Sequence, residues 1–367
     1  MFDNIKKHIY YDANFSVGEF RGMGKYINFF RKTLESKGFV VKGLLTKNLK
    51  DHKSISFGFS NYILWEQFSL PCFLYKNKGL YIYPYNTAPI WRWRKNSTEI
   101  LIVHDLIFFD NFGDNLTFKQ KIGKAYRKFI LPKIIKDFDH VITVSEYSKV
   151  EIVKKFGIDN NKIFVIPNSI ELTTANTEKK ENYIFHLGGE PDYKNTKTLI
   201  KAFSLLPNDI KDNFKLKIVG IRNVNSLREF KLICDELCIA DKVEFLGYLS
   251  DEAIKLLYKR AQIFVFTSFK EGFGIPLIEA MNNGTAVISS NSSCLPEVGG
   301  EAAMYFDPLN SKELSLKIIE VLNDADIREK MVIAGYKNVK RFSETQIEAK
   351  IVDFLQILNN ENTNNPS

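Results

Sequence analysis

The stretch Glu271-Gly272-Phe273-Gly274-Ile275-Pro276-Leu277-Ile278-Glu279 decides the fold, because it places a glycine turn between a strand and a helix. The run Ile263-Phe264-Val265-Phe266 before it is typical of a short buried strand, and Pro276 occupies a position favoured in the first helical turn. Backbone amides of residues 272–274 at this helix start can face a phosphate, which glycine allows to approach closely. Glu279, about two turns further on, can accept hydrogen bonds from hydroxyl groups. Phosphate and hydroxyls together indicate a nucleotide sugar.

The same alternation of short apolar strands and amphipathic helices occurs twice along the chain, which is typical of parallel α/β domains. In the first half the expected strands are Ile9–Asp12, Gly79–Tyr83, Ile100–Val103, Val141–Val144 and Ile163–Ile166. In the second half they are Tyr183–Leu187, Leu216–Val219, Val243–Leu246, Ile263–Phe266, Ala286–Ser289 and Met304–Phe306. The sequence therefore predicts an α/β protein with two Rossmann-like domains that face each other across a cleft.

A polar, weakly patterned segment over residues 167–180 separates the two halves and is typical of a linker. We place the domain boundary near residue 170, with an N-terminal acceptor-side domain over 1–170. A C-terminal nucleotide-sugar-binding domain then covers 171–367, and we expect its last helix to pack back on the N-terminal domain.

Composition limits the class of protein before any motif is considered. The chain has 367 residues, of which 45% are apolar, enough for two domains with their own cores. Its formal charge of +8 favours anionic partners such as diphosphates, acidic lipids or nucleic acid, without choosing among them. Four cysteines are too few for a secreted disulfide scaffold, and no stretch of about 20 apolar residues occurs. We therefore expect a cytoplasmic protein, at most peripheral to the plasma membrane.

Residues directly after the strands are the best candidates for function, because doubly wound sheets bind ligands at the carboxyl ends of their strands. His104 follows one such strand and can donate to a sugar hydroxyl or a developing charge, although a locally bonded loop histidine is the open alternative. Gly22 and Gly24 lie between the first strand and a helix, where glycine permits close approach of a ligand. In the second half, Lys194 can offer an ammonium to a diphosphate, although a single lysine after a strand is usually only solvated.

These residues, taken in order, resemble the retaining glycosyltransferases of the GT-B fold, specifically glycosyltransferase family 4 with its bacterial mannosyltransferases (group 1). The resemblance covers most of the chain. It rests on the segments Gly22–Tyr26, His104–Leu106, Val141–Glu146, Val165–Asn168, Gly188–Asn195, Glu271–Glu279, Gly284–Ile288 and Leu295–Gly300. The block from Glu271 to Glu279 is its most specific part.

The resemblance implies a role for each matching residue. Glu271 would face the hydroxyls of the donor sugar, and Glu279 would accept from the ribose. The amides of residues 273–275 would meet the phosphates, with Gly272, Gly274 and the turn at Gly188-Gly189 as further donor-binding positions. Lys194 would neutralise the leaving diphosphate. His104 would line the cleft near the sugar, and the loop at Gly22 and Gly24 would border phosphates and acceptor.

Two departures from the family pattern stand out. Many relatives carry an arginine near the lysine, whereas here Gly188 is followed by Gly189 and Lys194 by Asn195, which leaves the second phosphate-binding cation unassigned. Ser169 stands where relatives often have glycine after Pro-Asn, a change that we expect to affect only the turn of the linker.

The expected reaction is transfer of a hexose to an acceptor hydroxyl with retention at the anomeric carbon. The first candidate for the hexose is mannose, with GDP-mannose as its donor. The acceptor would be a growing or lipid-linked glycan of a bacterial surface polysaccharide such as O-antigen. We expect no cofactor and no metal, because a helix end and Lys194 can hold the diphosphate. A nucleotide-sugar epimerase of the same architecture and a basic nucleic-acid-binding protein are the alternatives, although no nucleic-acid-binding module is recognisable.

A membrane contact is a further expectation. Residues 118–130 are basic and amphipathic, and Trp91-Arg92-Trp93-Arg94-Lys95 adds aromatic rings among cations. Both segments can bind anionic lipid. A solvated helix face and a packed loop are the open alternatives.

Overall fold

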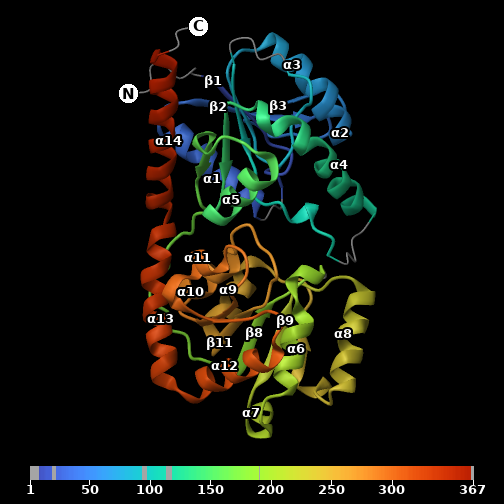
Figure 1. The fold of residues 1–367 in the computed structure, drawn as a ribbon, viewed down its shortest axis with the longest axis vertical. Helices are drawn as coiled ribbons and strands as arrows, with labels where there is room; N and C mark the ends of the chain where they lie inside the picture. Colours follow the sequence, from blue (N-terminus) through green and yellow to red (C-terminus); the bar gives the residue numbers. More distant parts are fainter. Residues whose placement is uncertain (1–7, 19–21, 93–96, 113–117, 190, 365–367) are drawn as a thin grey trace. The chain divides into compact units, whose positions relative to one another are not determined.

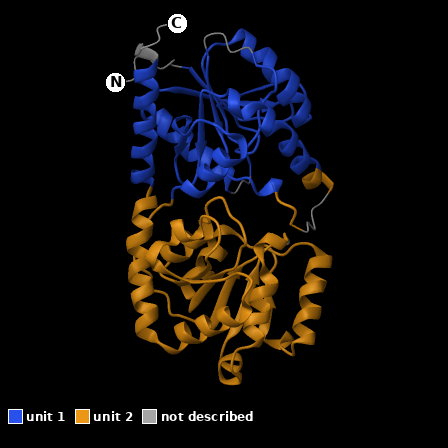
Figure 2. Ribbon diagram, viewed as in Figure 1, with its two compact units in different colours: residues 1–109, 122–169, 344–367 blue, residues 110–121, 170–343 orange. Residues whose placement is uncertain are grey.

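The computed structural model describes residues 8–18, 22–92, 97–112, 118–189 and 191–364, and the statements below concern these residues (Figure 1). The chain divides into two compact units (Figure 2). Unit 1 contains residues 1–109, 122–169 and 344–367, and unit 2 contains residues 110–121 and 170–343. Compared with the expected boundary near residue 170, the division additionally assigns residues 110–121 to unit 2 and the last 24 residues, 344–367, to unit 1.

Unit 1 is built on a seven-stranded sheet in the order β3-β2-β1-β4-β5-β6-β7, with every pair parallel. Its strands are β1 His8–Asp12, β2 Val40–Thr46, β3 Ser54–Phe57, β4 Leu80–Tyr83, β5 Thr98–Ile102, β6 His140–Thr143 and β7 Ile163–Val165. Its helices are α1 Met23–Ser36, α2 Tyr62–Leu64, the π-helix η1 Trp65–Ser69, α3 Leu70–Lys76, α4 Phe118–Ile134 (unit 1 from Ile122), α5 Glu146–Phe156 and α14 Glu344–Asn364.

Unit 2 is built on a six-stranded parallel sheet in the order β10-β9-β8-β11-β12-β13. Its strands are β8 Tyr183–Leu187, β9 Lys215–Val219, β10 Val243–Phe245, β11 Ile263–Phe266, β12 Ala286–Ser290 and β13 Ala303–Phe306. Its helices are α6 Thr196–Ser204, α7 Asn208–Asn213, α8 Val224–Glu236, α9 Asp251–Arg260, α10 Ile275–Asn282, α11 Leu295–Gly299, α12 Ser311–Asn323 and α13 Ala325–Val339.

The strand sequences explain why helices cover the sheets. Strand β11 is apolar at every position and fully buried, as expected for a strand with both faces covered. Each unit has its own apolar core, which includes Trp65 and Phe138 in unit 1 and Phe203 and Phe306 in unit 2. Two separate cores confirm the prediction of two α/β domains.

Both sheets reverse their strand order beside the first strand, between β1 and β4 in unit 1 and between β8 and β11 in unit 2. Open parallel sheets bind ligands at such reversal points, outside the carboxyl ends of the strands. The loops after these four strands are therefore where a functional site is expected.

Candidate functional site

The loops after β8 and β11 bring two predicted site residues together in unit 2. Lys194 lies in the loop after β8, and Glu271 lies in the loop after β11. The Lys194 Nζ atom is 2.8 Å from Glu271 Oε1, and both side chains are mostly buried. A lysine and a glutamate thus meet at the reversal point of the sheet, 77 residues apart in the chain.

The loop that carries Lys194 is fixed by the residue after it. Asn195 adopts a left-handed backbone with φ of 55°, which asparagine tolerates better than most residues. Its Nδ2 atom donates to the carbonyls of Thr267 at 3.1 Å and Pro308 at 2.8 Å. Thr267 Oγ1 in turn donates to the Lys194 carbonyl at 2.8 Å. Sequence reasoning missed this role for Asn195, although an asparagine before a helix start is a usable signal.

The backbone of Glu271 is held by the loop after β12. The Ser293 hydroxyl accepts from the Glu271 amide at 3.1 Å, and the Cys294 thiol donates to the Glu271 carbonyl at 3.2 Å. Ser293 itself has a positive φ of 53°. The polar loop after β12 therefore positions the backbone of Glu271.

The glycine turn opens into α10 as the sequence predicts. Gly274 has φ of 91°, and a Cβ atom there would lie 2.6 Å from Leu295 Cδ2. Among the described residues no side chain caps the start of α10, and Pro276 lies in its first turn. Phe273 is buried, and its ring packs edge-on against Phe342 at 5.2 Å. A helix start of this kind provides amides and positive dipole charge to an anion.

Glu279 lies on α10 and is half-buried. The hydroxyl of Tyr258 donates to Glu279 Oε2 at 3.3 Å. The carboxylate of Glu279 is thus already engaged by a hydroxyl, the kind of partner that the sequence predicts for it.

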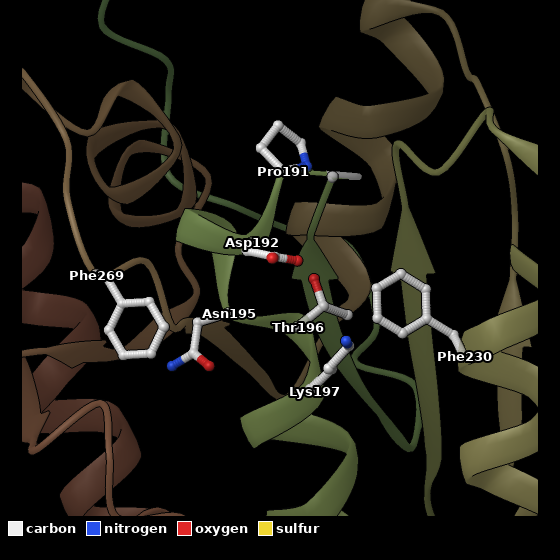
Figure 3. A pocket seen from close by; sticks show the side chains of 8 residues that line it. Pro191, Asp192, Asn195, Thr196, Lys197, Phe230 and Phe269 are labelled. Atoms are coloured by element: carbon white, nitrogen blue, oxygen red, sulfur yellow. The ribbon is translucent and has the colours of Figure 1, made fainter. Parts of the chain in front are cut away.

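The turn at Gly188-Gly189 is closely packed. A Cβ atom on Gly188 would lie 3.0 Å from the ring of His186 and from Thr196 Oγ1, so any other residue would press on these two side chains. A cavity of about 230 Å³ lies beside this turn (Figure 3). It is lined by Gly189, Pro191, Asp192, Asn195, Thr196, Lys197, Phe230 and Phe269. Of the predicted donor residues Gly189 lines it, whereas Lys194 and Glu271 do not.

A lysine other than Lys194 lines the cavity near the glycine turn. Lys197 is in the first turn of α6 and is 2.5 Å from Glu229 on α8. In Figure 3, the rings of Phe230 and Phe269 flank the polar residues of the cavity. Sequence reasoning did not single out any of these three residues.

The remaining predicted residues, His104, Gly22 and Gly24, lie in unit 1. Gly22 precedes α1 with φ of 54°, and Gly24 is buried in the first turn of that helix. His104 follows β5, and the ring of Tyr26 on α1 packs edge-on against it at 5.0 Å. Within unit 1, the glycine loop and His104 are thus close neighbours.

His104 is a buried neutral histidine. Its Nε2 atom is 3.0 Å from the Pro84 carbonyl, which can only accept, so the ring proton lies on Nε2. Burial lowers the pKa of His104 to about 4. Its donor nitrogen Nε2 therefore bonds the backbone, and Nδ1 is the acceptor nitrogen of the ring.

Among the described residues, no group of three or more His, Cys, Asp and Glu side chains is placed to hold a metal ion. No helix within the described ranges is both long enough and apolar enough to cross a bilayer.

The fold and the site define the class of protein. Two doubly wound parallel sheets, with a glycine turn and a helix start at the reversal point of unit 2, are the architecture of GT-B glycosyltransferases. Residues 168–338 match the family model described as "Glycosyl transferases group 1", and residues 79–174 match "Glycosyltransferase Family 4". The chain belongs to the group 1 glycosyltransferases of family 4.

Curated relatives agree with this assignment. The chain is 34% identical over 263 residues to the O-antigen chain mannosyltransferase RfbU of Salmonella typhimurium, covering 71% of this chain and 70% of that protein. It is 29% identical over 231 residues to the O-antigen chain mannosyltransferase B of Escherichia coli, covering 59% of this chain and 60% of that one.

Solved structures share the fold. A sucrose-phosphate synthase from Thermosynechococcus elongatus matches with a TM-score of 0.75 at 19% identity, over 96% of this chain and 98% of that one. A glycosyltransferase from Rickettsia africae matches with a TM-score of 0.69 at 18% identity, over 96% and 98% of the two chains. The prediction of a GT-B fold is confirmed.

Proposed function

We propose that this chain transfers mannose from GDP-mannose to a hydroxyl of a bacterial surface glycan, with retention at the anomeric carbon. The Salmonella and Escherichia relatives are O-antigen chain mannosyltransferases, which supports mannose as the sugar and O-antigen as the glycan. The observation that carries the proposal is the Lys194–Glu271 pair beside the start of α10, because it combines one cation, one sugar-binding carboxylate and an anion-binding helix start.

Each group has a distinct role in donor binding. The α10 start, with the amides of residues 273–275, binds the phosphates, while Lys194 neutralises charge on the departing diphosphate. Glu271 holds the Lys194 ammonium at 2.8 Å. The diphosphate competes for that ammonium and thereby frees Glu271 to accept from the sugar hydroxyls. Glu279 accepts from the ribose in the same way as it accepts from Tyr258.

Retention proceeds by front-face substitution, in which the leaving phosphate takes the acceptor proton. Retaining glycosidases instead use a carboxylate nucleophile about 5 Å from the acid. Glu271 does not act as the nucleophile, because once the diphosphate takes the Lys194 ammonium the Glu271 carboxylate accepts from the sugar hydroxyls and serves to position the sugar. Mass spectrometry of the enzyme after incubation with donor is expected to find no glycosyl adduct on Glu271. Detection of a glycosyl adduct on Glu271 would contradict front-face substitution and support double displacement.

The diphosphate is held without a metal ion. One helix start and one lysine supply the positive charge that a divalent cation supplies in other nucleotide sites. Activity is therefore expected to persist in EDTA. A complete loss of transfer in EDTA, restored by Mg²⁺ or Mn²⁺, contradicts this part of the proposal.

The deciding experiment incubates the full chain with a panel of nucleotide sugars and a mannose-terminated acceptor. We expect GDP-mannose to be consumed fastest, and NMR of the product to identify an α-linked mannose from the α-configured donor. If a UDP-sugar is consumed faster than GDP-mannose, the proposed donor is wrong. A new nucleotide sugar formed without acceptor supports the epimerase alternative instead.

The proposed acceptor is lipid-linked, and α4 supplies a surface that fits an anionic membrane. Phe118, Ile122, Ala125 and Phe129 follow helical spacing, and this apolar stripe is exposed, with Phe118 81% and Phe129 57% accessible. Lysines at 119, 121, 124, 128 and 133 lie on the same helix. An exposed apolar stripe with flanking cations is typical of an interfacial helix.

Part of the other predicted lipid contact is wrong. The Arg92 side chain is buried, with Nε 2.8 Å from Glu99, so it stabilises unit 1 and cannot face lipid. Trp91 is exposed, whereas Trp93, Arg94 and Lys95 lie outside the described residues.

Flotation with liposomes tests the contact made by α4. The chain is expected to float with vesicles that contain anionic lipid. Substitution of both Phe118 and Phe129 by Ser is expected to reduce flotation severalfold. Equal flotation of both proteins removes α4 from the proposal.

A further inference from the structure

Two buried carboxylates meet in unit 1, at the carboxyl end of β1. Asp12 ends β1 and is 4% exposed, and Glu66 on the π-helix η1 is 1% exposed. Tyr62 on α2 connects them, because its hydroxyl oxygen is 2.8 Å from Asp12 Oδ2 and 2.8 Å from Glu66 Oε1. The cluster lies at the reversal point of the sheet, where a ligand site is expected.

Two ionised carboxylates and one tyrosine hydroxyl carry a single proton between them. The arrangement of Asp12, Tyr62 and Glu66 needs one proton more than that. A tyrosine hydroxyl has one proton and can donate to only one of the two carboxyl groups. The other carboxyl group can bond the Tyr62 oxygen only by donating a proton of its own. At least one of Asp12 and Glu66 is therefore a neutral acid in this arrangement.

The other contacts of the two carboxyl groups cannot remove this requirement, because they are donors. Asp12 Oδ1 accepts from the Asn14 amide at 2.9 Å and from its Nδ2 at 2.8 Å. Glu66 Oε2 accepts from the hydroxyls of Tyr126 and Thr87 and from Gln67 Nε2. No lysine or arginine of the described ranges forms an ion pair with either group.

The charged and titratable neighbours are few. Tyr126 and Arg127 face the cluster from α4, and Tyr85 faces Asp12 from the loop after β4. Burial raises the pKa of Asp12 to about 6 and that of Glu66 to about 7. The extra proton is thus exchanged near neutral pH.

Asp12 also fixes the segment that follows it. Asn14, bound to Asp12, accepts from the Thr46 amide at 3.0 Å, and the Ser16 carbonyl accepts from Asn28 on α1 at 3.2 Å. Phe15 between them packs on the rings of Tyr62 at 5.0 Å and Tyr85 at 4.9 Å while half of it stays exposed. A change at the Asp12–Tyr62 contact therefore acts directly on residues 13–16.

We propose that Asp12, Tyr62 and Glu66 share one extra proton beyond that of the Tyr62 hydroxyl, and that with it they are positioning residues that hold residues 13–16 for binding of the acceptor. This second part rests on the proposed glycosyl transfer. When the proton leaves, two buried negative charges compete for one hydroxyl proton, and the segment loses its fixed position. The apparent KM for acceptor then rises by up to about tenfold per pH unit above the pKa, because only the protonated fraction binds well.

The first experiment needs no activity. A carboxyl group with a raised pKa binds protons more tightly when folded, so its contribution to stability is full below its unfolded pKa and is lost as the pH rises through the folded pKa. For the full chain, this loss of stability is expected to lower Tm as the pH is raised from about 5 to 8. Glu66→Gln and Asp12→Asn remove the need for the extra proton, and both are expected to flatten that part of the profile. A profile parallel to wild type in both variants overturns the shared proton.

A matched pair of tyrosine variants separates the proton from simple loss of a buried hydroxyl. Tyr62→Phe removes the shared hydroxyl. Tyr83→Phe removes a hydroxyl in the same unit that lies 3.1 Å from Glu99, which is already ion-paired with Arg92. Tyr62→Phe is expected to change the pH profile of Tm, and Tyr83→Phe to lower Tm equally at all pH values. The same profile in both variants contradicts the proposal.

The second experiment measures the acceptor. Wild-type KM for the mannose-terminated acceptor is expected to rise above neutral pH, and that of Glu66→Gln to stay flat, with KM for the donor unchanged in both. If Glu66→Gln flattens the pH dependence of Tm but leaves the pH dependence of KM for the acceptor as in wild type, the shared proton is supported and its positioning role is overturned. If no nucleotide sugar is consumed by wild type, the proposed function fails while the Tm result still decides the shared proton.

Discussion

Lys194 and Glu271 form a pair whose value lies in catalysis more than in stability. The two side chains are mostly buried, so loss of the pair lowers the free energy of unfolding by about 1–3 kcal/mol, more than loss of an exposed pair does. Loss of one charge-stabilising donor in an active site lowers kcat by about 10²–10³-fold. We predict both effects for Lys194→Ala, measured by transfer kinetics and by chemical denaturation. Lys242→Ala, which removes an exposed pair with Asp212, is the matched control and should transfer at the wild-type rate.

Asn195 combines two demands that substitutions can separate. Asn195→Gly keeps the left-handed backbone but loses three side-chain hydrogen bonds, to the carbonyls of Thr267 and Pro308 and from the Thr198 hydroxyl, which contribute about 1.5–4 kcal/mol together. Asn195→Ala loses the same bonds and adds a left-handed alanine, at about 1–2 kcal/mol more. Urea unfolding of both variants measures the difference. Equal midpoints would mean that the backbone conformation at this position carries no strain.

At the scale of elements, Gly274 determines where α10 begins. Gly274→Ala must place a Cβ atom 2.6 Å from Leu295 in a backbone with φ of 91°. Gly157, which ends α5 with φ of 62°, has nothing within 4 Å of such an atom and is the matched control. We predict that Gly157→Ala costs about 1 kcal/mol of strain and keeps activity, whereas Gly274→Ala costs more and loses donor binding. Equal losses of stability and activity contradict a role for the contact with Leu295.

Apolar runs predict most of the strands but not all. The expected strands near β1 and β4 to β13 are present with ends shifted by a residue or two at most, because buried parallel strands are largely apolar. Strands β2 and β3 were not predicted. Lys42 and Gly43 interrupt the apolar run of β2, and β3 is an edge strand with two serines. Glycine occurs at position 43 because a Cβ atom there would collide with the Ser54 side chain on the neighbouring strand β3.

The candidate site was predictable where it depends on local sequence. Strand, glycine turn and helix are continuous in the chain, so Glu271 and the α10 start follow from residues 263–279. Contacts between distant segments were not predictable in this way. Asp12 and Glu66 are 54 positions apart by number, and neither belongs to a motif; only the fold brings both to Tyr62.

At the scale of the whole molecule, α14 completes unit 1 from the far end of the chain. It buries Ile347, Ile351, Phe354, Leu355 and Leu358. The ring of Phe354 lies 4.8 Å from that of Phe164. Each such side chain contributes about 1.5–3 kcal/mol, so together they match the whole stability of a domain, about 5–15 kcal/mol.

We predict that a fragment of residues 1–169 does not unfold cooperatively, and that joining residues 344–367 to it through a flexible linker restores a cooperative transition. A fragment of residues 170–343 retains the complete sheet of unit 2 and should fold alone. Circular dichroism during heating measures all three proteins. A cooperative transition of 1–169 without α14 contradicts the estimate.

The late position of α14 also has a consequence for synthesis in the cell. Ribosomes add about 5–20 residues per second, so the 174 residues from 170 to 343, the span in which unit 2 is completed, take about 9–35 s. During that interval the nascent unit 1 exposes the apolar surface around Phe164 that α14 later covers. The first unit to be translated is therefore the last to be finished, and its unfinished face is a binding surface for chaperones until the final helix leaves the ribosome.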